Sequence, residues 1–263
     1  MNNFLVRVFG YYATIVFGDS AVTDRWFWLR RNLRSGNLRT LDAGCGSGSF
    51  ALYAARRGNI VVGISFDEQN NRKATERAKI LKLNNIKFIT EDLGRLGEMA
   101  NDLGLFDQII CFETIEHILK DRKLVGDFSN LLKPGGRLLL TAPYLHYDTH
   151  LLGDDKFELS TYDASGNLLK GEPGGHVRLG YNHEQLEEIL SESNLEVIKK
   201  DYITGFISQC VVRAIRVVSG IISPKVAWAI TFPMRILPIF DGPITSLLRR
   251  PYLSVGIVAK KKQ

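Results

Sequence analysis

Two patterns of apolar and polar residues alternate along the chain. Short apolar runs of β-branched and aliphatic residues predict buried strands, and longer segments with apolar residues at helical spacing predict helices. The predicted strands are residues 37–41, 59–64, 86–90, 106–112, 137–142, 195–203 and 251–261. The predicted helices are residues 49–57, 67–84, 117–132 and 183–193, and KPGG at 133–136 predicts a turn. Strands that alternate with helices indicate an α/β fold with a mostly parallel sheet, in which ligands bind at the carboxyl ends of the strands.

Two segments do not fit this alternation. Residues 143–182 form a long loop region with Tyr, His, Asp and Gly, and a loop of that length in a compact domain is usually functional. Between the last two predicted strands, helical spacing places apolar residues on one side and polar residues or Gly on another. The apolar set is Ile207, Val211, Ala214, Ile215, Val218 and Ile222, and the other set is Gln209, Arg213, Arg216 and Gly220. We therefore predict an N-terminal helical cap (1–37), a main domain (38–203 plus 251–263) and an amphipathic helical insertion (204–250).

Composition narrows the setting of the protein. The formal net charge is +6, but from residue 202 onward nine Lys and Arg residues face one acidic residue, so the excess of positive charge belongs to the C-terminal quarter. This distribution predicts one local basic surface rather than a coat for nucleic acid. Three widely separated cysteines form no disulfide or metal pattern, which favours a reducing, cytoplasmic location. The apolar N-terminus is a poor signal peptide, and no transmembrane helix is expected.

The stretch LDAGCGSGSF, residues 41–50, places three glycines directly after a predicted strand. Gly44, Gly46 and Gly48 allow a sharp turn and a close approach of the backbone to a ligand. The helix predicted from Ser49 onward presents its N-terminal N–H groups at the same place. A tight turn without a ligand is the alternative, but Asp42 at the strand end makes the pattern more specific than a lone glycine-rich motif.

Further motifs follow in order: VVGISFDEQ, FITEDL, FDQIICFETIEHI, LLKPGGRLLLTAP and GGHVRLGYNHEQLEEIL. Together they resemble the class I S-adenosylmethionine (SAM)-dependent methyltransferases of the methyltransferase-11 and ubiquinone-pathway O-methyltransferase type, from about Leu38 to Val197 and again at the last strand. The resemblance implies a Rossmann-like, mostly parallel seven-stranded sheet of order 3-2-1-4-5-7-6 with helices on both faces. A dinucleotide-binding oxidoreductase is the alternative, but KPGG and the Glu-His pair after the fourth strand have no place in it.

The resemblance also implies which residues bind SAM. They are Asp42, Gly44, Cys45, Gly46, Gly48, Ser65, Asp67, Gln69, Asp92, Leu93 and Glu113. The glycine loop corresponds to the part that holds the methionine moiety. Ser65 stands where most relatives have an acidic residue for the ribose hydroxyls, so Gln69, or less directly Asp67, is expected to replace it; a helix N-cap is the alternative role of Asp67. Asp92 corresponds to the adenine contact, with Glu91 as the competing residue, and Glu113 to the floor of the pocket.

Methyl transfer from a sulfonium requires alignment of the acceptor and exclusion of water, and an oxygen acceptor also requires a base. The candidate catalytic residues are His117, His146, His150, His176 and Tyr144. A helix-capping role is the alternative for His117. The E-x-x-E-H pattern of Glu113, Glu116 and His117 is similar to clusters in ubiquinone-pathway and small-RNA 2′-O-methyltransferases, which hold a divalent cation together with a later His. We expect no metal, and keep these three residues as the alternative ligands.

These features predict a cytoplasmic SAM-dependent methyltransferase that methylates a hydroxyl of a small or lipid-like acceptor. Basic amphipathic helices with aromatic residues are typical of contact with a membrane surface. Residues 206–250 are therefore expected to contact the inner face of a membrane, to cover the pocket, or to form a homodimer interface. A nucleic-acid partner is not expected. The alternatives are a metal-assisted RNA 2′-O-methyltransferase and a peripheral membrane protein that binds SAM without turnover.

Overall fold

Seven strands form one sheet in the computed structural model, which describes residues 3–17, 20–153, 158–163, 167–172, 174–222, 226, 230–231, 233–234 and 241–262. The strands are β1 (Arg39–Ala43), β2 (Ile60–Ser65), β3 (Ile86–Thr90), β4 (Phe106–Phe112), β5 (Leu132–Pro143), β8 (Leu195–Ile203) and β9 (Ser254–Lys261). Their order is β3-β2-β1-β4-β5-β9-β8, and β9 runs antiparallel to both neighbours. This is the predicted order 3-2-1-4-5-7-6, because β6 (Thr161–Tyr162) and β7 (Leu168–Lys170) form a separate hairpin. The Rossmann-like fold prediction is confirmed.

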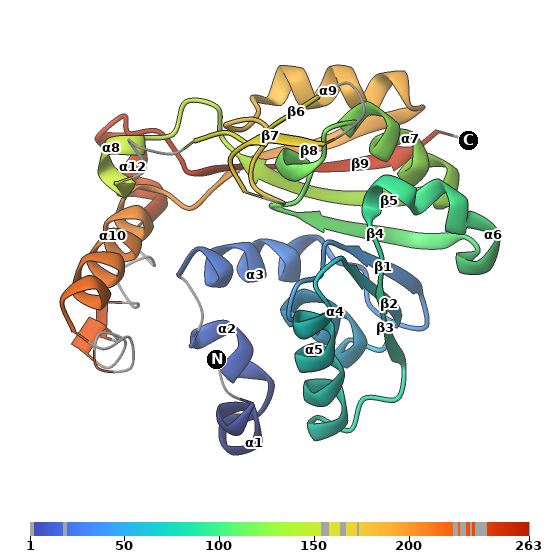
Figure 1. The fold of residues 1–263 in the computed structure, drawn as a ribbon, viewed down its shortest axis with the longest axis horizontal. Helices are drawn as coiled ribbons and strands as arrows, with labels where there is room; N and C mark the ends of the chain where they lie inside the picture. The colour runs from blue at the N-terminus through green and yellow to red at the C-terminus, as the bar shows by residue number, and fades with distance from the viewer. Residues whose placement is uncertain are drawn as a thin grey trace.

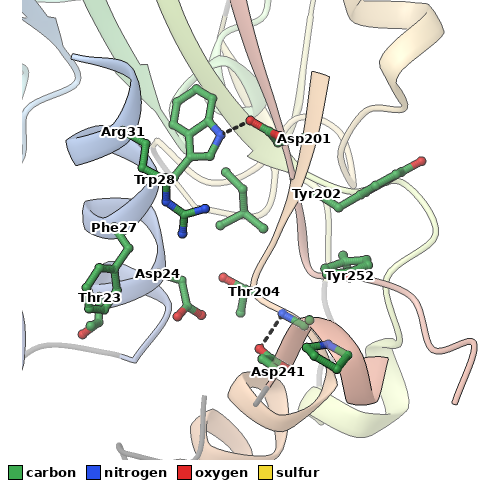
Figure 2. Close-up of a pocket in the computed structure, with 14 residues that line it drawn as sticks. Thr23, Asp24, Phe27, Trp28, Arg31, Asp201, Tyr202, Thr204, Asp241 and Tyr252 are labelled. Atoms are coloured by element: carbon green, nitrogen blue, oxygen red, sulfur yellow. Dashed lines mark hydrogen bonds between the residues drawn. The ribbon is translucent and has the colours of Figure 1, made fainter. Parts of the chain in front are cut away.

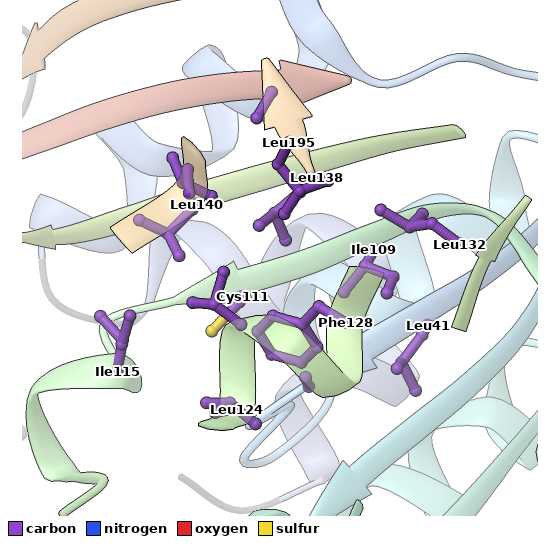
Figure 3. Packing of buried hydrophobic residues seen from close by; sticks show 14 of the residues in the cluster. Leu41, Ile109, Cys111, Ile115, Leu124, Phe128, Leu132, Leu138, Leu140 and Leu195 are labelled. Carbon is purple, nitrogen blue, oxygen red and sulfur yellow. The ribbon is translucent and has the colours of Figure 1, made fainter. Parts of the chain in front are cut away.

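Helices cover both faces of this sheet (Figure 1). On one face lie α3 (Ser20–Asn32), α4 (Ser49–Arg56) and α5 (Glu68–Ile80), and on the other lie α7 (Asp121–Leu131) and α9 (His183–Glu192). Two apolar layers result. Phe128 and Leu124 of α7 pack on Ile109 and Cys111 of β4 in the first layer (Figure 3), whereas Trp28 and the alanines of α4 form the second.

Local capping explains where several of these helices begin. The Asp67 side chain accepts hydrogen bonds from the N–H groups of Gln69 and Asn70 at the start of α5, as predicted. Asn182 and Gln185 form a reciprocal capping box at the start of α9. His183 is the first residue of α9, and its Nε2 lies 3.0 Å from the carbonyl oxygen of Asp201.

Three local predictions were wrong in detail. KPGG is an irregularity inside β5 rather than a separate turn: β4 pairs with Leu132 and again with Arg137, so the four residues between them bulge from the ladder. The helix predicted from His117 begins only at Asp121, because a short 3-10 helix, η3 (Ile115–His117), precedes it. Gln209 is buried rather than on a polar face, since its Nε2 donates to the carbonyl oxygens of Thr204 and Pro251.

Additional helices precede β1 and connect β8 to β9. Before β1 come α1 (Phe4–Phe9), η1 (Gly10–Tyr12), α2 (Ala13–Val16) and α3, and between β8 and β9 come α10 (Phe206–Ile221) and α12 (Asp241–Leu247). The rest of the chain includes η2 (Leu93–Met99), α6 (Ala100–Leu103) and α8 (Thr149–Leu152). In Figure 1, α10 extends away from the sheet on the same side as α1 and α2. Most of residues 224–240 of the predicted insertion lie outside the described residues. No described helix is long and apolar enough to cross a membrane.

Candidate active site

The loop between β1 and α4 has the backbone geometry that its glycines predict. Gly44, Gly46 and Gly48 have positive φ angles of 83°, 48° and 84°. A Cβ at Gly44 would lie 2.2 Å from the Oγ1 of Thr114, whereas a Cβ at Gly46 would meet nothing within 4 Å. The first glycine is therefore required by close packing, and the second leaves open space beside the backbone, as a ligand-binding loop needs.

Asp42 lies buried at the end of β1, directly before this loop. Burial raises the pKa of its carboxyl to about 7, and a hydrogen bond from the backbone of Ala51 in α4 opposes that rise. Within the described part of the chain, its Oδ2 has no hydrogen-bond partner. An unsatisfied buried carboxylate favours a nearby cation, so the site fits the ammonium group of SAM that the resemblance implies.

Two residues of α5 that sequence analysis did not single out hold the strand ends and the loop in place. The buried Arg77 donates from Nη1 to the backbone and hydroxyl oxygens of Ser47, both at 2.8 Å. The Nδ2 of Asn71 donates to the carbonyl oxygen of Ser65 at the end of β2 and to residues at the end of β3. Cys45 is buried, and burial raises the pKa of its thiol well above the ordinary value, which opposes formation of a nucleophilic thiolate.

Asp67 follows the end of β2 and caps the N-terminus of α5. Its Oδ1 accepts from two backbone N–H groups of α5, and its Oδ2 accepts from Nδ2 of Asn70. Ser65 is buried, and its hydroxyl accepts a hydrogen bond from the N–H of Asp67. Gln69 is exposed on the first turn of α5. Because both oxygens of Asp67 are used by the cap, the amide of Gln69 stays the predicted ribose contact.

A cavity of about 530 Å³ lies beyond the ends of β3 and β4. Its lining includes Phe66, Asp92, Leu93, Ile118 and Leu119. Asp92 is exposed, and its Oδ1 accepts from the N–H of Gly94 at the start of η2. Glu91, the competing residue, is not among the lining residues and lies 3.5 Å from the Nη1 of Arg95. The cavity therefore favours Asp92 as the predicted adenine contact.

Glu113 follows β4 and has a positive φ of 44°, which is uncommon for a residue with a side chain. The hydroxyl of Thr141 donates to its Oε1 at 2.9 Å, and the hydroxyl of Ser254 donates to its Oε2 at 3.3 Å. Arg25 of α3 forms an ion pair with Oε2 at 3.2 Å. Glu113 is thus bound to β5, β9 and the N-terminal helices, in agreement with a position at the floor of a site. Sequence analysis did not identify Arg25 as its partner.

The turn η3 brings Glu116 and His117 together with His176, which lies in the long loop after β5. The potential ligand atoms of these three residues all lie within 4.8 Å of one another. The Nδ1 of His117 lies 2.8 Å from the carbonyl oxygen of Gly174. Because a carbonyl oxygen only accepts, Nδ1 carries the proton, and Nε2 of the neutral ring presents a lone pair. The His117 and His176 rings meet edge to face, with centroids 4.4 Å apart.

Glu116 is buried in this group, and burial and the nearby charge of Glu113 raise the pKa of its carboxyl well above the ordinary value. Its Oε2 has no hydrogen-bond partner among the described residues. A carboxyl oxygen beside two imidazoles suits either a divalent cation with nitrogen and oxygen ligands or the proton of an acceptor hydroxyl. The structure groups His176, and not Glu113, with Glu116 and His117.

The other candidate catalytic residues lie outside this group of three. His146 is exposed, and its ring packs on Tyr144 with centroids 5.4 Å apart. Tyr144 is partly buried and also packs on Tyr202 of β8. His150 is exposed on α8. The structure thus separates the histidines that sequence analysis treated together.

The fold, the glycine loop and the polar group at the strand ends define a protein of the class I SAM-dependent methyltransferase type. A family described as methyltransferase domain matches residues 34–197, which is more than half of the chain. The chain belongs to this methyltransferase family, as the sequence motifs indicated.

Curated relatives resemble part of the chain. It is 31% identical over 111 residues to the ubiquinone biosynthesis O-methyltransferase of Coxiella burnetii (42% of this chain, 46% of that protein). It is 34% identical over 116 residues to the enzyme of that name from Neisseria meningitidis (41% of this chain, 48% of that protein). The chain thus spans about half the length of the curated relatives that it matches.

Solved structures support the same fold. Phosphoethanolamine N-methyltransferase 2 of Haemonchus contortus aligns with a TM-score of 0.61 at 20% identity, covering 99% of this chain and 60% of that one. An S-adenosylmethionine dependent methyltransferase of Mesorhizobium loti aligns with a TM-score of 0.56 at 16% identity, covering 94% and 100%. At these identities the likeness concerns the fold.

Proposed function

We propose that the protein transfers the methyl group of SAM to a hydroxyl oxygen of a small or lipid-like acceptor. The observation that carries this proposal is the group of Glu116, His117 and His176 beside the predicted cofactor site. An oxygen acceptor loses a proton when it is methylated, so a neutral imidazole nitrogen close to the acceptor has a direct use. The likeness to ubiquinone biosynthesis O-methyltransferases is consistent with this acceptor class.

In this proposal, separate groups of residues bind SAM, align the acceptor and accept its proton. The glycine loop and Asp42 hold the methionine end of SAM, and the cavity beside Asp92 takes the adenine. Glu113, neutralised by Arg25, forms the floor on which the acceptor is aligned with the methyl group. The Nε2 of His117 accepts the proton of the acceptor hydroxyl, while the carbonyl of Gly174 holds the ring in the required tautomer.

The same group of three suggests a second candidate, metal-assisted transfer. Glu116, His117 and His176 would hold a divalent cation, which when bound lowers the pKa of a hydroxyl ligand. The Nε2 of His117 can serve as a metal ligand or as a base, but one lone pair cannot do both at once. Chelation therefore separates the two candidates: activity that survives EDTA favours the base, and activity that Mg²⁺ restores after EDTA favours the metal.

Exposed apolar side chains support a lipid-like acceptor reached from a membrane surface. Phe4 and Phe9 of α1 are 61% and 56% exposed, and Ile221 at the end of α10 is 77% exposed. Exposed arginines accompany them, among them Arg7 on α1 and Arg216 on α10. Apolar residues flanked by cations favour contact with an anionic lipid surface. Sedimentation with phosphatidylglycerol vesicles, but not with phosphatidylcholine vesicles, would support this contact, and Phe9→Ser should weaken it.

Methyl incorporation from radiolabelled SAM tests the proposed function. The enzyme is incubated with host extract, which is then split into organic-soluble and aqueous pools, and labelled products are identified by mass spectrometry. We expect a methyl ether in the organic pool and a loss of at least tenfold in His117→Asn and His176→Asn. The exposed His146→Asn variant is the matched control and should keep full activity. Label confined to the aqueous pool would refute a lipid-like acceptor, and label released by ribonuclease would establish an RNA acceptor instead.

A further inference from the structure

A second cavity, of about 510 Å³, lies between α3 and the segment that leads from β8 into α10 (Figure 2). Its lining includes Asp24, Trp28, Arg31, Tyr202, Thr204 and Tyr252. The cavity lies at the same edge of the sheet as the active site, since β8 ends there at Ile203 and the antiparallel β9 begins there at Ser254. None of the residues that are proposed to bind SAM lines this cavity.

Asp24 supplies an unsatisfied carboxylate oxygen to this cavity. Its Oδ2 is shielded from solvent and makes no hydrogen bond of normal geometry with any described residue. Burial raises the pKa of the carboxyl to about 6; the charge of Asp241 adds to the rise, and the hydroxyls of Ser208 and Thr204 and the charge of Arg25 oppose it. A shielded carboxylate without a full set of donors is costly unless a donor or a cation joins it.

The other two carboxylates of the cavity already have partners. Asp201 accepts from the indole N–H of Trp28 at 2.6 Å and forms an ion pair with Lys199 at 2.8 Å. Asp241 accepts from the backbone N–H groups of Gly205 and Ile207 at the start of α10. Asp24 is therefore the carboxylate of this cavity that is left to bind a cationic or donor group.

Arg31 supplies the opposite charge. It lies two turns after Asp24 on α3, about 10 Å further along the helix axis. Figure 2 shows both side chains on the side of α3 that faces the cavity. Among the described residues, none forms a hydrogen bond or an ion pair with the side chain of Arg31. Trp28 comes between Asp24 and Arg31 along α3, but in Figure 2 its ring lies beyond the guanidinium of Arg31, on the side away from Asp24. Tyr202 stacks on Tyr252 across the cavity, with ring centroids 5.3 Å apart. Aromatic faces next to a carboxylate are a favourable environment for an ammonium group.

The cavity adjoins the proposed site of methyl transfer. Arg25, the neighbour of Asp24 on α3, pairs with Glu113 at the floor of that site. The ring of Trp28 packs on Phe112, the last residue of β4, with centroids 5.6 Å apart. One helix thus contributes to the floor of the active site and to the wall of the cavity. A molecule that enters the cavity lies next to the elements that align the acceptor.

We propose that this cavity binds a zwitterionic group, with its ammonium at Asp24 and its anion at Arg31, and that this group is the polar end of the methyl acceptor. The second part rests on the proposed function. The acceptor then carries the hydroxyl to be methylated and, separated from it, an ammonium and an anion less than about 10 Å apart.

The indole N–H signals of the ¹⁵N-labelled full chain give a direct test, because the protein has three Trp residues and Trp28 lines the cavity. The probe is γ-aminobutyrate, and n-butylamine and butyrate are controls of equal length with one charge each. We expect a saturable shift of the Trp28 signal, which Trp28→Phe assigns, with at least tenfold weaker binding of both controls. Asp24→Asn and Arg31→Gln should each weaken binding at least tenfold, whereas the exposed Asp102→Asn and Arg30→Gln should leave it unchanged.

Other results would overturn the inference. Absence of a saturable shift, equal binding of the single-charge controls, or binding by Asp24→Asn and Arg31→Gln at wild-type strength would each refute the zwitterion site. If γ-aminobutyrate binds but does not inhibit methyl transfer, the cavity is not part of the acceptor site. If it binds while no hydroxyl of any acceptor is methylated, the proposed function fails and the binding site stands.

Discussion

The Asp42→Asn substitution separates the cost of burying a carboxyl from its use in holding a cation. Burial raises the pKa of this group from its ordinary value of 3.8 to about 7. A difference of about 3 units corresponds to about 4 kcal/mol. Because the folded protein keeps this proton to a higher pH than the unfolded chain does, the carboxyl lowers the free energy of unfolding progressively from about pH 4 to pH 7, and most strongly above pH 7.

An Asn side chain does not ionise, so the variant without cofactor should escape this effect. We expect the difference in unfolding free energy, variant minus wild type, to grow by about 2–3 kcal/mol between pH 5 and pH 8. For a chain of this size, each kcal/mol shifts the melting temperature by about 2–4 °C. Thermal unfolding at the two pH values measures the difference, and Asp102→Asn on the exposed surface of α6 is the control. An equal difference at both pH values would refute the buried-carboxyl argument.

The same substitution, which should stabilise the protein without cofactor, should weaken the binding of SAM. A cation held within about 4–6 Å lowers the pKa of a carboxyl by about 1–3 units, so SAM binds the ionised form about tenfold to a thousandfold more tightly. We expect the affinity of the wild type for SAM to fall below pH 7 and its binding to release a proton there. Calorimetry at pH 6.5 in two buffers of different ionisation enthalpy measures that release. If Asp42→Asn binds SAM as tightly as the wild type at pH 8, Asp42 does not hold the cation.

Five further substitutions test the site in three experiments. Gly44→Ala should destabilise the fold by about 3 kcal/mol or more in thermal unfolding, because the new Cβ would overlap a neighbouring side chain and because the backbone has a positive φ there. Gly46→Ala has only the backbone strain, so it should lower the stability of the fold by about 1 kcal/mol and instead weaken SAM binding. Arg77→Ala should raise the dissociation constant of SAM at least tenfold by calorimetry, because the buried guanidinium holds the glycine loop; unchanged binding would contradict this. A double-mutant cycle with Arg25→Ala and Glu113→Gln should give a coupling energy of about 1–3 kcal/mol in urea unfolding, because both side chains are largely buried, and additive effects would exclude a stabilising ion pair.

Several elements of the fold follow from local sequence alone. The pattern FDQIICF predicted β4 at residues 106–112, and LEVIKKDYI predicted β8 at 195–203, with bounds that the structure reproduces. Both are continuous segments whose alternation or apolar character is sufficient to define a strand. The cap of α5 by Asp67 is equally local. The start of α7 is not, because the contacts of His117 and Glu116 with the loop after β5 favour a short 3-10 turn before the helix begins.

The sequence by itself determined the order of strands and helices, the glycine turn and the methyltransferase family, because these depend on residues close together in the chain. Tertiary structure decided which polar residues meet. His117 finds Gly174 57 positions away, and Arg25 reaches Glu113 from a helix that precedes the whole sheet. Such pairs leave no periodic trace in the sequence, since they depend on how the strands are ordered and where their connections cross the edge of the sheet. The cavity of Asp24 and Arg31 exists for the same reason: α3 and the end of β8 are distant in sequence, and only the folded sheet brings them together.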